Sequence, residues 1–276
     1  MVIRHNLLNA EELNANQNFI HQYLQSTAVG VNIKKLEKSF ADNHVLKGID
    51  LDIRPGETIV ILGKSGAGKT ILLRHIIGLE KPDSGNIYIN GEDINSPDFS
   101  KKHRIAMVFQ SCALFNSLSV KENIALYLRE HKIFRDEDKI DKIVSDSLSI
   151  VGLDGREASM PNELSGGMKR RVAIARALVM NPELILYDEP TTGLDPMMTR
   201  TIGDVILNLR EHVEVTQIVV THNVDLAFHI ADRIALISEG RIIEVGSPED
   251  IERSTNPIVQ TFIREQFERP QGGNRL

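Results

Sequence analysis

A glycine-rich loop and a pair of consecutive acids are the residues of this chain best suited to chemistry on phosphates. The loop occupies residues 63–70, and the acids, Asp188 and Glu189, follow an apolar run. Glycines let the backbone turn its N–H groups inward around phosphate oxygens, and a following helix adds its positive N-terminus. The residues expected to contact nucleotide here are Gly63, Lys64, Ser65, Gly66, Ala67, Gly68, Lys69, Thr70 and Ile71.

Four side chains of these two segments have expected roles in hydrolysis. Lys69 would reach the β and γ phosphates, and the Thr70 hydroxyl would ligate Mg²⁺. Asp188 would hold the same metal through its water shell, and Glu189 would act as general base on the attacking water. A strand followed by Asp-Glu-Pro is by itself more often a capped turn. The phosphate loop reverses that preference.

Two further polar side chains follow predicted strands. Gln110 ends the strand of residues 104–109 and could ligate Mg²⁺ through its neutral amide. His222 follows the strand of residues 217–220 and could hydrogen-bond the γ-phosphate as a catalytic group. A lone Gln or His is usually solvated. Their position matters because ligands of parallel sheets gather at the carboxyl edge.

A second loop, residues 164–168, reads Leu-Ser-Gly-Gly-Met. Its two glycines, Gly166 and Gly167, expose backbone N–H groups, and Ser165 can cap a helix that begins near Met168. In isolation an ordinary helix start would be the favoured interpretation. Beside a phosphate loop, the segment predicts a second contact with nucleotide phosphate.

These residues require an α/β core to position them. Residues 58–62 form a short apolar run directly before the glycine loop, and residues 70–79 have helix period, which predicts strand, loop and helix. Further β-like runs occur at residues 86–90, 104–109, 184–187, 217–220 and 234–237, and the apolar ones among them suit strands buried on both faces of a mostly parallel sheet. Residues 32–40 and 48–53 predict an antiparallel edge sheet. Between residues 120 and 180 the pattern is helical, which predicts an inserted helical subdomain.

The domain organisation predicted from this pattern has three parts. Residues 1–30 form an N-terminal extension, residues 31–250 the core domain with its helical subdomain at about 116–180, and residues 251–276 a C-terminal helical extension and tail. A hairpin turn is expected at residues 238–241. Pro248 is expected to start a final helical section that runs through Phe267.

Composition excludes several classes of protein. The chain has 276 residues, 41% hydrophobic and 25% charged, and a net charge of -6 that gives no general attraction to nucleic acid. The single cysteine, Cys112, excludes an intramolecular disulfide and fits a reducing compartment. No signal-peptide block and no uncharged apolar run long enough to cross a bilayer is visible. Any membrane role is therefore expected to work through a partner.

Taken together, six segments resemble the ATP-binding-cassette (ABC) ATPases over residues 32–250. They are residues 63–70, Gln110, residues 164–168, Asp188-Glu189, Gly193-Leu194-Asp195 and His222. The resemblance implies a P-loop NTPase (RecA-like) core that hydrolyses ATP with Mg²⁺. It also implies a head-to-tail homodimer in which Ser165, Gly166 and Gly167 of one copy contact the ATP of the other.

The same resemblance assigns two more residues. Asp195 would communicate between the two nucleotide sites, and Phe40 would stack on adenine, although Phe40 alone would be interpreted as core. Two positions depart from the common cassette pattern: Ile71 replaces a second hydroxyl residue, and Met168 replaces the usual Gln. Each removes one polar contact to nucleotide, and neither should abolish hydrolysis.

A narrower resemblance comes from residues 72–79, 107–131 and 168–171, which are similar to the MlaF-like ATPases of the MCE/Mla lipid-transport systems. It implies a peripheral subunit on the cytoplasmic face of the bacterial inner membrane that powers phospholipid movement across the envelope. The implied partners are integral membrane permease subunits, an MCE-domain protein and a small regulatory subunit. A permease helix is expected to seat at residues 113–115, and the segment 257–263 to reach a neighbouring subunit or the regulatory partner.

Three alternatives stay open at this point. The chain could be a soluble ABC ATPase that acts on a protein scaffold, or the ATPase of an importer for another substrate. It could also be a P-loop kinase, but a kinase leaves residues 164–168 and His222 unexplained. The membrane proteins that co-purify with the chain would discriminate among these functions.

Overall fold

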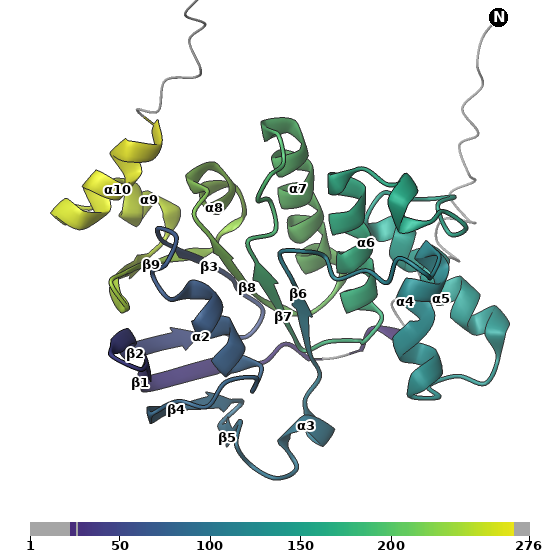
Figure 1. Ribbon diagram of the computed structural model, residues 1–276, viewed down its shortest axis with the longest axis horizontal. Helices are drawn as coiled ribbons and strands as arrows, with labels where there is room; N and C mark the ends of the chain where they lie inside the picture. Colours follow the sequence, from purple (N-terminus) through teal and green to yellow (C-terminus); the bar gives the residue numbers. More distant parts are fainter. Residues whose placement is uncertain (1–22, 26, 268–276) are drawn as a thin grey trace, which may run out of the picture.

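The computed structural model describes residues 23–25 and 27–267, which form two β-sheets and a helical cluster (Figure 1). The smaller sheet is antiparallel, with strand order β2-β1-β4-β5. Its strands are β1 (Val31–Phe40), β2 (Asn43–Ile53), β4 (Ser84–Ile89) and β5 (Glu92–Asp93). This is the predicted antiparallel edge sheet, extended by two strands.

The larger sheet has the order β10-β9-β3-β8-β7-β6, and all its neighbours are parallel except β10, which is antiparallel to β9. Its strands are β3 (Thr58–Leu62), β6 (Ile105–Val108), β7 (Leu184–Asp188), β8 (Thr216–Thr221), β9 (Arg233–Ser238) and β10 (Arg241–Gly246). Every residue of β3, β7 and β8 is buried, which explains why these strands have continuous apolar runs rather than alternation.

Helix α2 (Lys69–Ile76) lies between the two sheets, where it follows β3 after the glycine loop (Figure 1). Leu72, Leu73 and Ile76 are fully buried in a core cluster that includes residues from both sheets. The short helix α3 (Phe99–Lys102) lies on the connection from β5 to β6. Because both sheets hold α2, the N-terminus of this helix is fixed against the ends of β3, β7 and β8.

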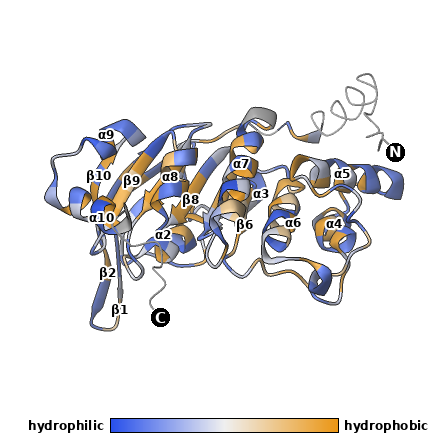
Figure 2. Cartoon of the chain, turned by 90° about the horizontal axis from the view of Figure 1, so that it is seen from above, coloured by the Kyte–Doolittle hydropathy of each residue, from blue (hydrophilic) through white to orange (hydrophobic). Residues whose placement is uncertain are grey.

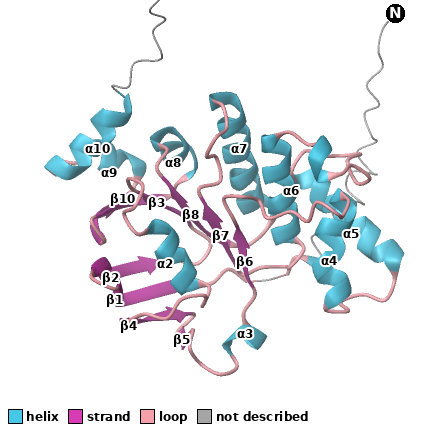
Figure 3. Ribbon diagram, viewed as in Figure 1, coloured by secondary structure: helices cyan, strands magenta, loops and turns pink. Residues whose placement is uncertain are grey.

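The helices α4 (Val120–Glu130), α5 (Glu137–Ile150) and α6 (Gly166–Leu178) cluster at one end of the molecule (Figure 3). The 3₁₀ turn η1 (Pro161–Glu163) precedes α6, and Ser119 begins α4 with a capping box to Glu122. Figure 2 shows hydrophobic residues concentrated in the strands of the larger sheet and hydrophilic ones on the outer surface of α5. The strand-free helical segment predicted from residue 120 onward is therefore present.

The remaining helices are α7 (Pro196–His212), α8 (Val224–Ile230), α9 (Pro248–Glu252) and α10 (Pro257–Phe267). Val259 and Phe262 of α10 are buried in the chain's own core, whereas Ile258 is 47% exposed. Pro248 does start a helix, as expected. The final helical section is nevertheless two helices, because the chain leaves helical geometry between Glu252 and Pro257.

The predicted fold class is confirmed, and the structure decides to which sheet each predicted strand belongs. The strand expected at residues 86–90 belongs to the antiparallel sheet, where β4 pairs with β1, and not to the parallel one. A Cβ atom on Gly85 would lie 2.3 Å from the carbonyl oxygen of Lys35, so glycine permits the close approach of β4 to β1. The domain boundaries proposed from the sequence stay predictions.

The expected N-terminal extension lies largely outside the described residues. Within the described part, the Tyr23 hydroxyl donates to the carbonyl oxygen of Val179 at 2.7 Å, and Leu24 is buried in the core cluster around α4 to α6. The hairpin turn expected at residues 238–241 joins β9 to β10, with positive φ at Glu239 and Gly240. Over the ranges 23–25 and 27–267, no helix combines the length and apolar character that crossing a bilayer requires.

Candidate nucleotide site

The glycine loop ends at an open helix N-terminus. Gly66 and Gly68 have φ of +83° and +101°, and Gly68 caps α2 without any side-chain hydrogen bond. A Cβ atom on Gly68 would lie 2.8 Å from a methyl carbon of Leu46, so both conformation and space require glycine there. The first N–H groups of α2 are therefore presented to an anion without a competing side chain.

Lys69 is held inside the loop that precedes it. Its side chain is 5% exposed, and Nζ donates to the carbonyl oxygens of Gly63 at 2.7 Å and Lys64 at 3.0 Å. The same ammonium lies 3.3 Å from Oε1 of Glu189. Lys69 is thus oriented by two backbone acceptors while it pairs with the acid expected to be the base.

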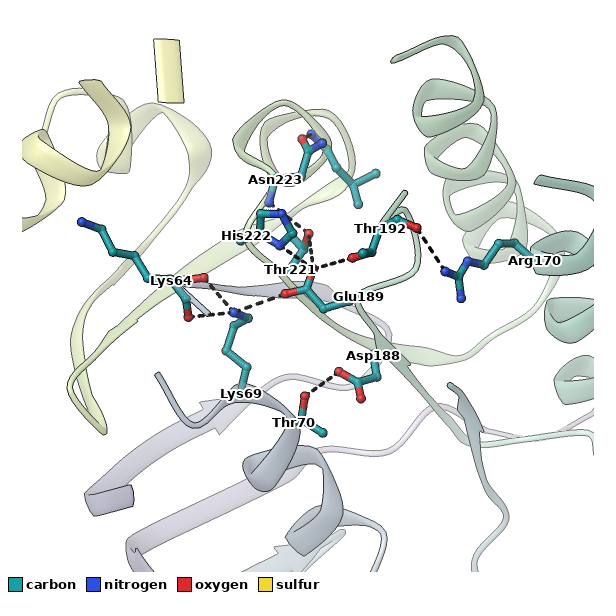
Figure 4. Close-up of polar contacts among 12 residues, drawn as sticks. Lys64, Lys69, Thr70, Arg170, Asp188, Glu189, Thr192, Thr221, His222 and Asn223 are labelled. Carbon is teal, nitrogen blue, oxygen red and sulfur yellow. Dashed lines mark hydrogen bonds and ion pairs between the residues drawn. The ribbon is translucent and has the colours of Figure 1, made fainter. Parts of the chain in front are cut away.

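Glu189 is the most connected residue of the site (Figure 4). Its Oε2 accepts from Nδ1 of His222 at 2.8 Å and from the hydroxyls of Thr192 and Thr221 at 3.3 and 3.4 Å. Because a carboxylate can only accept, Nδ1 of His222 carries the proton in this contact. The residue has φ of +46° and is 8% exposed, and such strain in a buried glutamate is typical of functional positions.

Asp188 and Thr70 form the second polar contact. The Thr70 hydroxyl donates to Oδ1 of Asp188 at 2.8 Å. Burial, and to a lesser extent the neighbouring Glu189 carboxylate, raises the pKa of Asp188, and the Thr70 hydrogen bond acts in the opposite direction. Two hard oxygen donors at a helix N-terminus fit Mg²⁺, which takes few protein ligands beside water and phosphate oxygens. The described residues contain no group of three His, Cys, Asp or Glu suited to caging a metal.

These groups surround one cleft of about 330 Å³. Its lining residues come from five segments of the chain and are Val45, Ser65, Gly66, Gly68, Lys69, Thr70, Ile71, Gln110, Glu189, Thr192 and His222. Gln110 lies in the cleft, as its position after β6 predicts. A larger cavity of about 820 Å³ lies on the antiparallel sheet and is lined by neither the phosphate loop nor the acids, so chemistry rather than volume identifies the site.

Nine predicted residues lie outside this cleft lining. Gly63, Lys64 and Ala67 belong to the phosphate loop itself, and Asp188 reaches the site through its hydrogen bond with Thr70. The other five are Phe40, Asp195, Ser165, Gly166 and Gly167. Phe40 is 42% exposed at the end of β1, with the Lys38 ammonium 5.1 Å from its ring centroid. Oδ1 of Asp195 accepts from the backbone N–H of Met198 at 2.8 Å and so caps α7.

The second loop is positioned by the segment that follows the acids. The Ser165 hydroxyl accepts from the backbone N–H of Met168 at 3.3 Å, which confirms the predicted helix cap. A Cβ atom on Gly167 would lie 2.9 Å from Sδ of Met198, and one on Gly166 would lie 3.4 Å from Leu194. Residues on either side of Asp195, Leu194 and Met198, therefore form the surface against which this loop packs.

Reasoning from the sequence missed four contributors to the site. Val45 and Thr192 line the cleft, Thr221 donates to Glu189, and Arg170 donates to the carbonyl oxygen of Thr192 at 3.2 Å. The two threonines sit within three residues of Glu189 or next to His222, so adjacency was an available signal. Nothing in the local pattern marks Val45 or Arg170, because their roles depend on contacts between segments distant in the chain.

A family model described as ABC transporter matches residues 46–192 of this chain. That range contains the phosphate loop, Gln110, the second loop and both acids. It ends directly before Gly193 and does not reach His222.

Curated relatives cover most of the chain. The Arabidopsis thaliana protein TRIGALACTOSYLDIACYLGLYCEROL 3, chloroplastic, is 39% identical over 87% of this chain and 75% of its own length. A probable ribonucleotide transport ATP-binding protein, mkl, from Mycobacterium leprae is 38% identical over 85% and 69%. A sulfate/thiosulfate import ATP-binding protein, CysA, from Xylella fastidiosa is 41% identical over 85% and 68%.

Solved structures have the same fold. The cbiO1 protein of Clostridium perfringens, described as part of the transporter complex cbiONQ, superposes with a TM-score of 0.74 at 32% identity, over 85% of this chain and 94% of its own. The ATP-binding cassette MJ0796, a dimer bound to ADP and Pi, superposes with a TM-score of 0.69 at 33% identity, over 79% and 98%.

Proposed function

This chain belongs to the ABC transporter family of ATPases, and from that membership we propose that two copies close head to tail on two ATP molecules and so drive a membrane permease. Binding and hydrolysis of ATP are the activity of the family. The arrangement of the dimer, the roles of single residues and the transported substrate are the proposed parts.

One observation supports the proposed head-to-tail dimer. The cleft that gathers Lys69, Glu189 and His222 includes no residue of the loop at Ser165–Gly167, although that loop also presents a helix N-terminus. A loop that offers N–H groups to an anion, but not to its own chain's anion site, is suited to the site of a second copy. The dimeric form of MJ0796 supports this assembly.

Hydrolysis would begin from the Lys69–Glu189 ion pair. Phosphate oxygens of ATP would compete with Oε1 of Glu189, which lies 3.3 Å from the Lys69 ammonium, because both are anionic acceptors for the same donor. The carboxylate released from Lys69 can then take a proton from the attacking water. His222 and Thr192 hold its other oxygen, so Glu189 keeps its orientation as general base.

The metal ligands proposed are Thr70, Asp188 and Gln110. Thr70 and Asp188 already share a hydrogen bond, and Gln110 lines the same cleft. Mg²⁺ bound there would neutralise charge on the transferred phosphate. The residues proposed for the nucleotide are those of the phosphate loop with Phe40, which lies outside the cleft lining and would have to meet adenine at its rim.

The permease is proposed to contact the segment after Gln110. Phe115 is 52% exposed, and Phe109, directly before Gln110, is 38% exposed, so both rings offer apolar surface to a partner. Leu114 packs against the chain's own core. A Phe115→Asp variant should therefore keep the ATPase activity of the isolated chain and lose assembly with the permease, and retained assembly would contradict this docking site.

For the transported substrate we propose phospholipid, with an MCE-domain protein and a small regulatory subunit in the complex at the cytoplasmic face of the inner membrane. Support comes from the MlaF-like segments of the sequence and from the Arabidopsis relative, which is named after a glycerolipid. Other relatives are named for ribonucleotide and for sulfate, so the family alone does not select the substrate.

Complementation between two inactive variants tests the dimer. A Lys69→Ala chain lacks a working phosphate loop, and a Ser165→Arg chain lacks a working second loop. A mixed dimer retains one intact composite site, so mixing should restore ATPase activity that neither variant has alone. Full activity of the Ser165→Arg chain alone, or hydrolysis by monomers, would refute the composite site.

Purification from native membranes tests the substrate. A tagged full-length chain should bring down an integral membrane permease and an MCE-domain protein, and extracts of the complex should contain phospholipid by mass spectrometry. Recovery of a permease together with a sulfate-binding protein would instead assign an importer of small anions.

A further inference from the structure

Arg170 connects three segments of the chain near the nucleotide cleft. It lies in the first turns of α6, directly after the loop at Ser165–Gly167, and is 7% exposed. Its guanidinium donates to the carbonyl oxygen of Phe109 at 3.3 Å through one terminal nitrogen and to that of Thr192 at 3.2 Å through the other. Figure 4 shows Arg170 reaching Thr192, which in turn contacts Glu189.

The two carbonyl oxygens belong to two separate segments that contribute Gln110 and Thr192 to the cleft lining. Phe109 immediately precedes Gln110, the proposed metal ligand, so one hydrogen bond fixes the start of that segment. Thr192 donates its hydroxyl to Oε2 of Glu189 at 3.3 Å, so the other hydrogen bond fixes the segment that orients the base. Both segments are thereby hydrogen-bonded to the helix that carries the second loop.

A buried guanidinium needs hydrogen-bond acceptors to compensate for the loss of water around its charge. Within the described residues, Arg170 forms no ion pair with a carboxylate, so backbone oxygens compensate its charge. Its nitrogens form a rigid planar fork, which fixes the distance between the two carbonyl groups that it joins. Separation of the two segments would leave part of a buried cation unpaired.

A second arginine of α6 reinforces the connection on one side. Arg176 donates to the carbonyl oxygens of Cys112 and Ala113 at 2.8 and 2.7 Å. Both residues have positive φ, +62° and +46°, a conformation that an isolated chain disfavours. The segment around Gln110 is therefore attached to α6 at its beginning and again two residues after Gln110.

We propose that Arg170 is a positioning residue that sets the Ser165–Gly167 loop relative to both Gln110 and Glu189, so that ATP in a chain's own cleft determines how that chain presents its loop to its partner's ATP. The inference rests on the head-to-tail dimer proposed above. Arg170 touches no phosphate in this assignment. It acts through the backbone of the two segments that carry Gln110 and Glu189.

The test separates nucleotide binding from closure, in full-length chains carrying Glu189→Gln to prevent turnover. Affinity of the single chain is measured with a fluorescent ADP analogue, and ATP-driven closure by the dimer fraction in sedimentation. Arg170→Gln should leave the ADP affinity within about twofold and raise the ATP concentration for half-closure at least about tenfold, within the usual range of coupling between sites. Arg170→Lys can reach only one carbonyl group at a time, so its ATP concentration for half-closure should lie between those of the parent and Arg170→Gln.

Arg171→Gln is the matched control. Arg171 is the next residue of α6 and also donates to two backbone oxygens, those of Val151 and Gly152, but these lie at the end of α5. Its substitution removes the same kind of contact and should shift closure by less than about twofold. Thermal unfolding of all variants shows whether each is folded. If Arg170→Gln does not fold, Arg170→Lys still provides the test.

Three results would overturn the inference. Equal closure by the Arg170 and Arg171 variants would make Arg170 an ordinary structural residue. A parallel loss of ADP affinity would place its effect in the chain's own phosphate site rather than in the coupling. Absence of ATP-driven dimers in the Glu189→Gln parent would refute the dimer itself, and the inference with it.

Discussion

Two helix N-termini of this protein, those of α2 and α6, present backbone N–H groups in similar ways but differ in what surrounds them. At α2 the cap is Gly68, which has no side chain, and Lys69, Asp188, Glu189 and His222 lie close by. At α6 the cap is Ser165, whose hydroxyl already accepts from the backbone N–H of Met168, and none of the residues 164–168 carries a titratable side chain. The first end can bind and react, whereas the second can only bind.

The two loops also differ in why each requires glycine. Gly66 before α2 has φ of +83° with no atom within 4 Å of an added Cβ, so conformation requires glycine. Gly167 has no positive φ but faces Sδ of Met198 at 2.9 Å, so space requires it. The phosphate loop is therefore constrained by its own backbone conformation. The loop at residues 164–168 is constrained by the side chain that packs against it.

Removing the base at the α2 end should have the largest effect. Glu189→Gln keeps the phosphate loop and the metal ligands but cannot take a proton, so kcat should fall about 100-fold or more while ATP still binds. Phosphate release measures the turnover. Glu239→Gln is the control, because Glu239 also has positive φ but is exposed at the β9–β10 turn. Undiminished turnover in Glu189→Gln would contradict the assignment of Glu189 as the general base at the α2 N-terminus.

Removing the cap at the α6 end should have a smaller effect of a different kind. Ser165→Ala loses a helix cap and one donor toward the partner's phosphate, so the ATP concentration for half-maximal hydrolysis should rise about tenfold, with binding of ADP to single chains unchanged. Ser119→Ala removes the comparable cap of α4, away from both loops. If both variants changed hydrolysis alike, the α6 loop would be only a helix start.

Exchanging the glycines sharpens the comparison further. Gly66→Ala and Gly167→Ala should each destabilise the fold by about 1–3 kcal/mol, the first through strain and the second through overpacking. Met198→Ala opens space only beside Gly167, so it should rescue Gly167→Ala and leave Gly66→Ala unimproved. Urea unfolding of the single and double variants measures this. Equal rescue of both would show that the two loops share one constraint.

The smallest effect expected concerns the protonation of Asp188. Because burial raises its pKa above the unfolded value, the folded chain binds the proton more tightly, and stability falls as the pH rises through the folded pKa. Asp188→Asn keeps an acceptor for Thr70 and removes that loss, so the urea midpoint should rise at pH 8 and not at pH 3. Asp195→Asn replaces one helix cap by an equivalent one and should change little at either pH. A midpoint unchanged at pH 8 would contradict the burial argument.

The sequence was sufficient wherever the requirement is local. Continuous apolar runs predicted β3, β7 and β8 because a strand covered on both faces has no solvent side, and Ser165 was predicted as a cap because capping acts over three residues. The resemblance of six short segments to the ABC ATPases predicted the cassette fold, again from local sequence. Each motif is a short backbone geometry that few other residues can adopt.

Tertiary structure decided every relation between segments. The assignment of β4 to the antiparallel sheet depends on Gly85 meeting Lys35 across the sheet, and the placement of Gly167 depends on Met198. Arg170 looked like one of several basic residues after the second loop, and only packing buries it between Phe109 and Thr192. Local pattern fixes which backbone shapes form, because those energies act within a turn or a strand. Contacts over tens of residues fix which groups meet, because burial and pairing of charge exist only after the chain has folded.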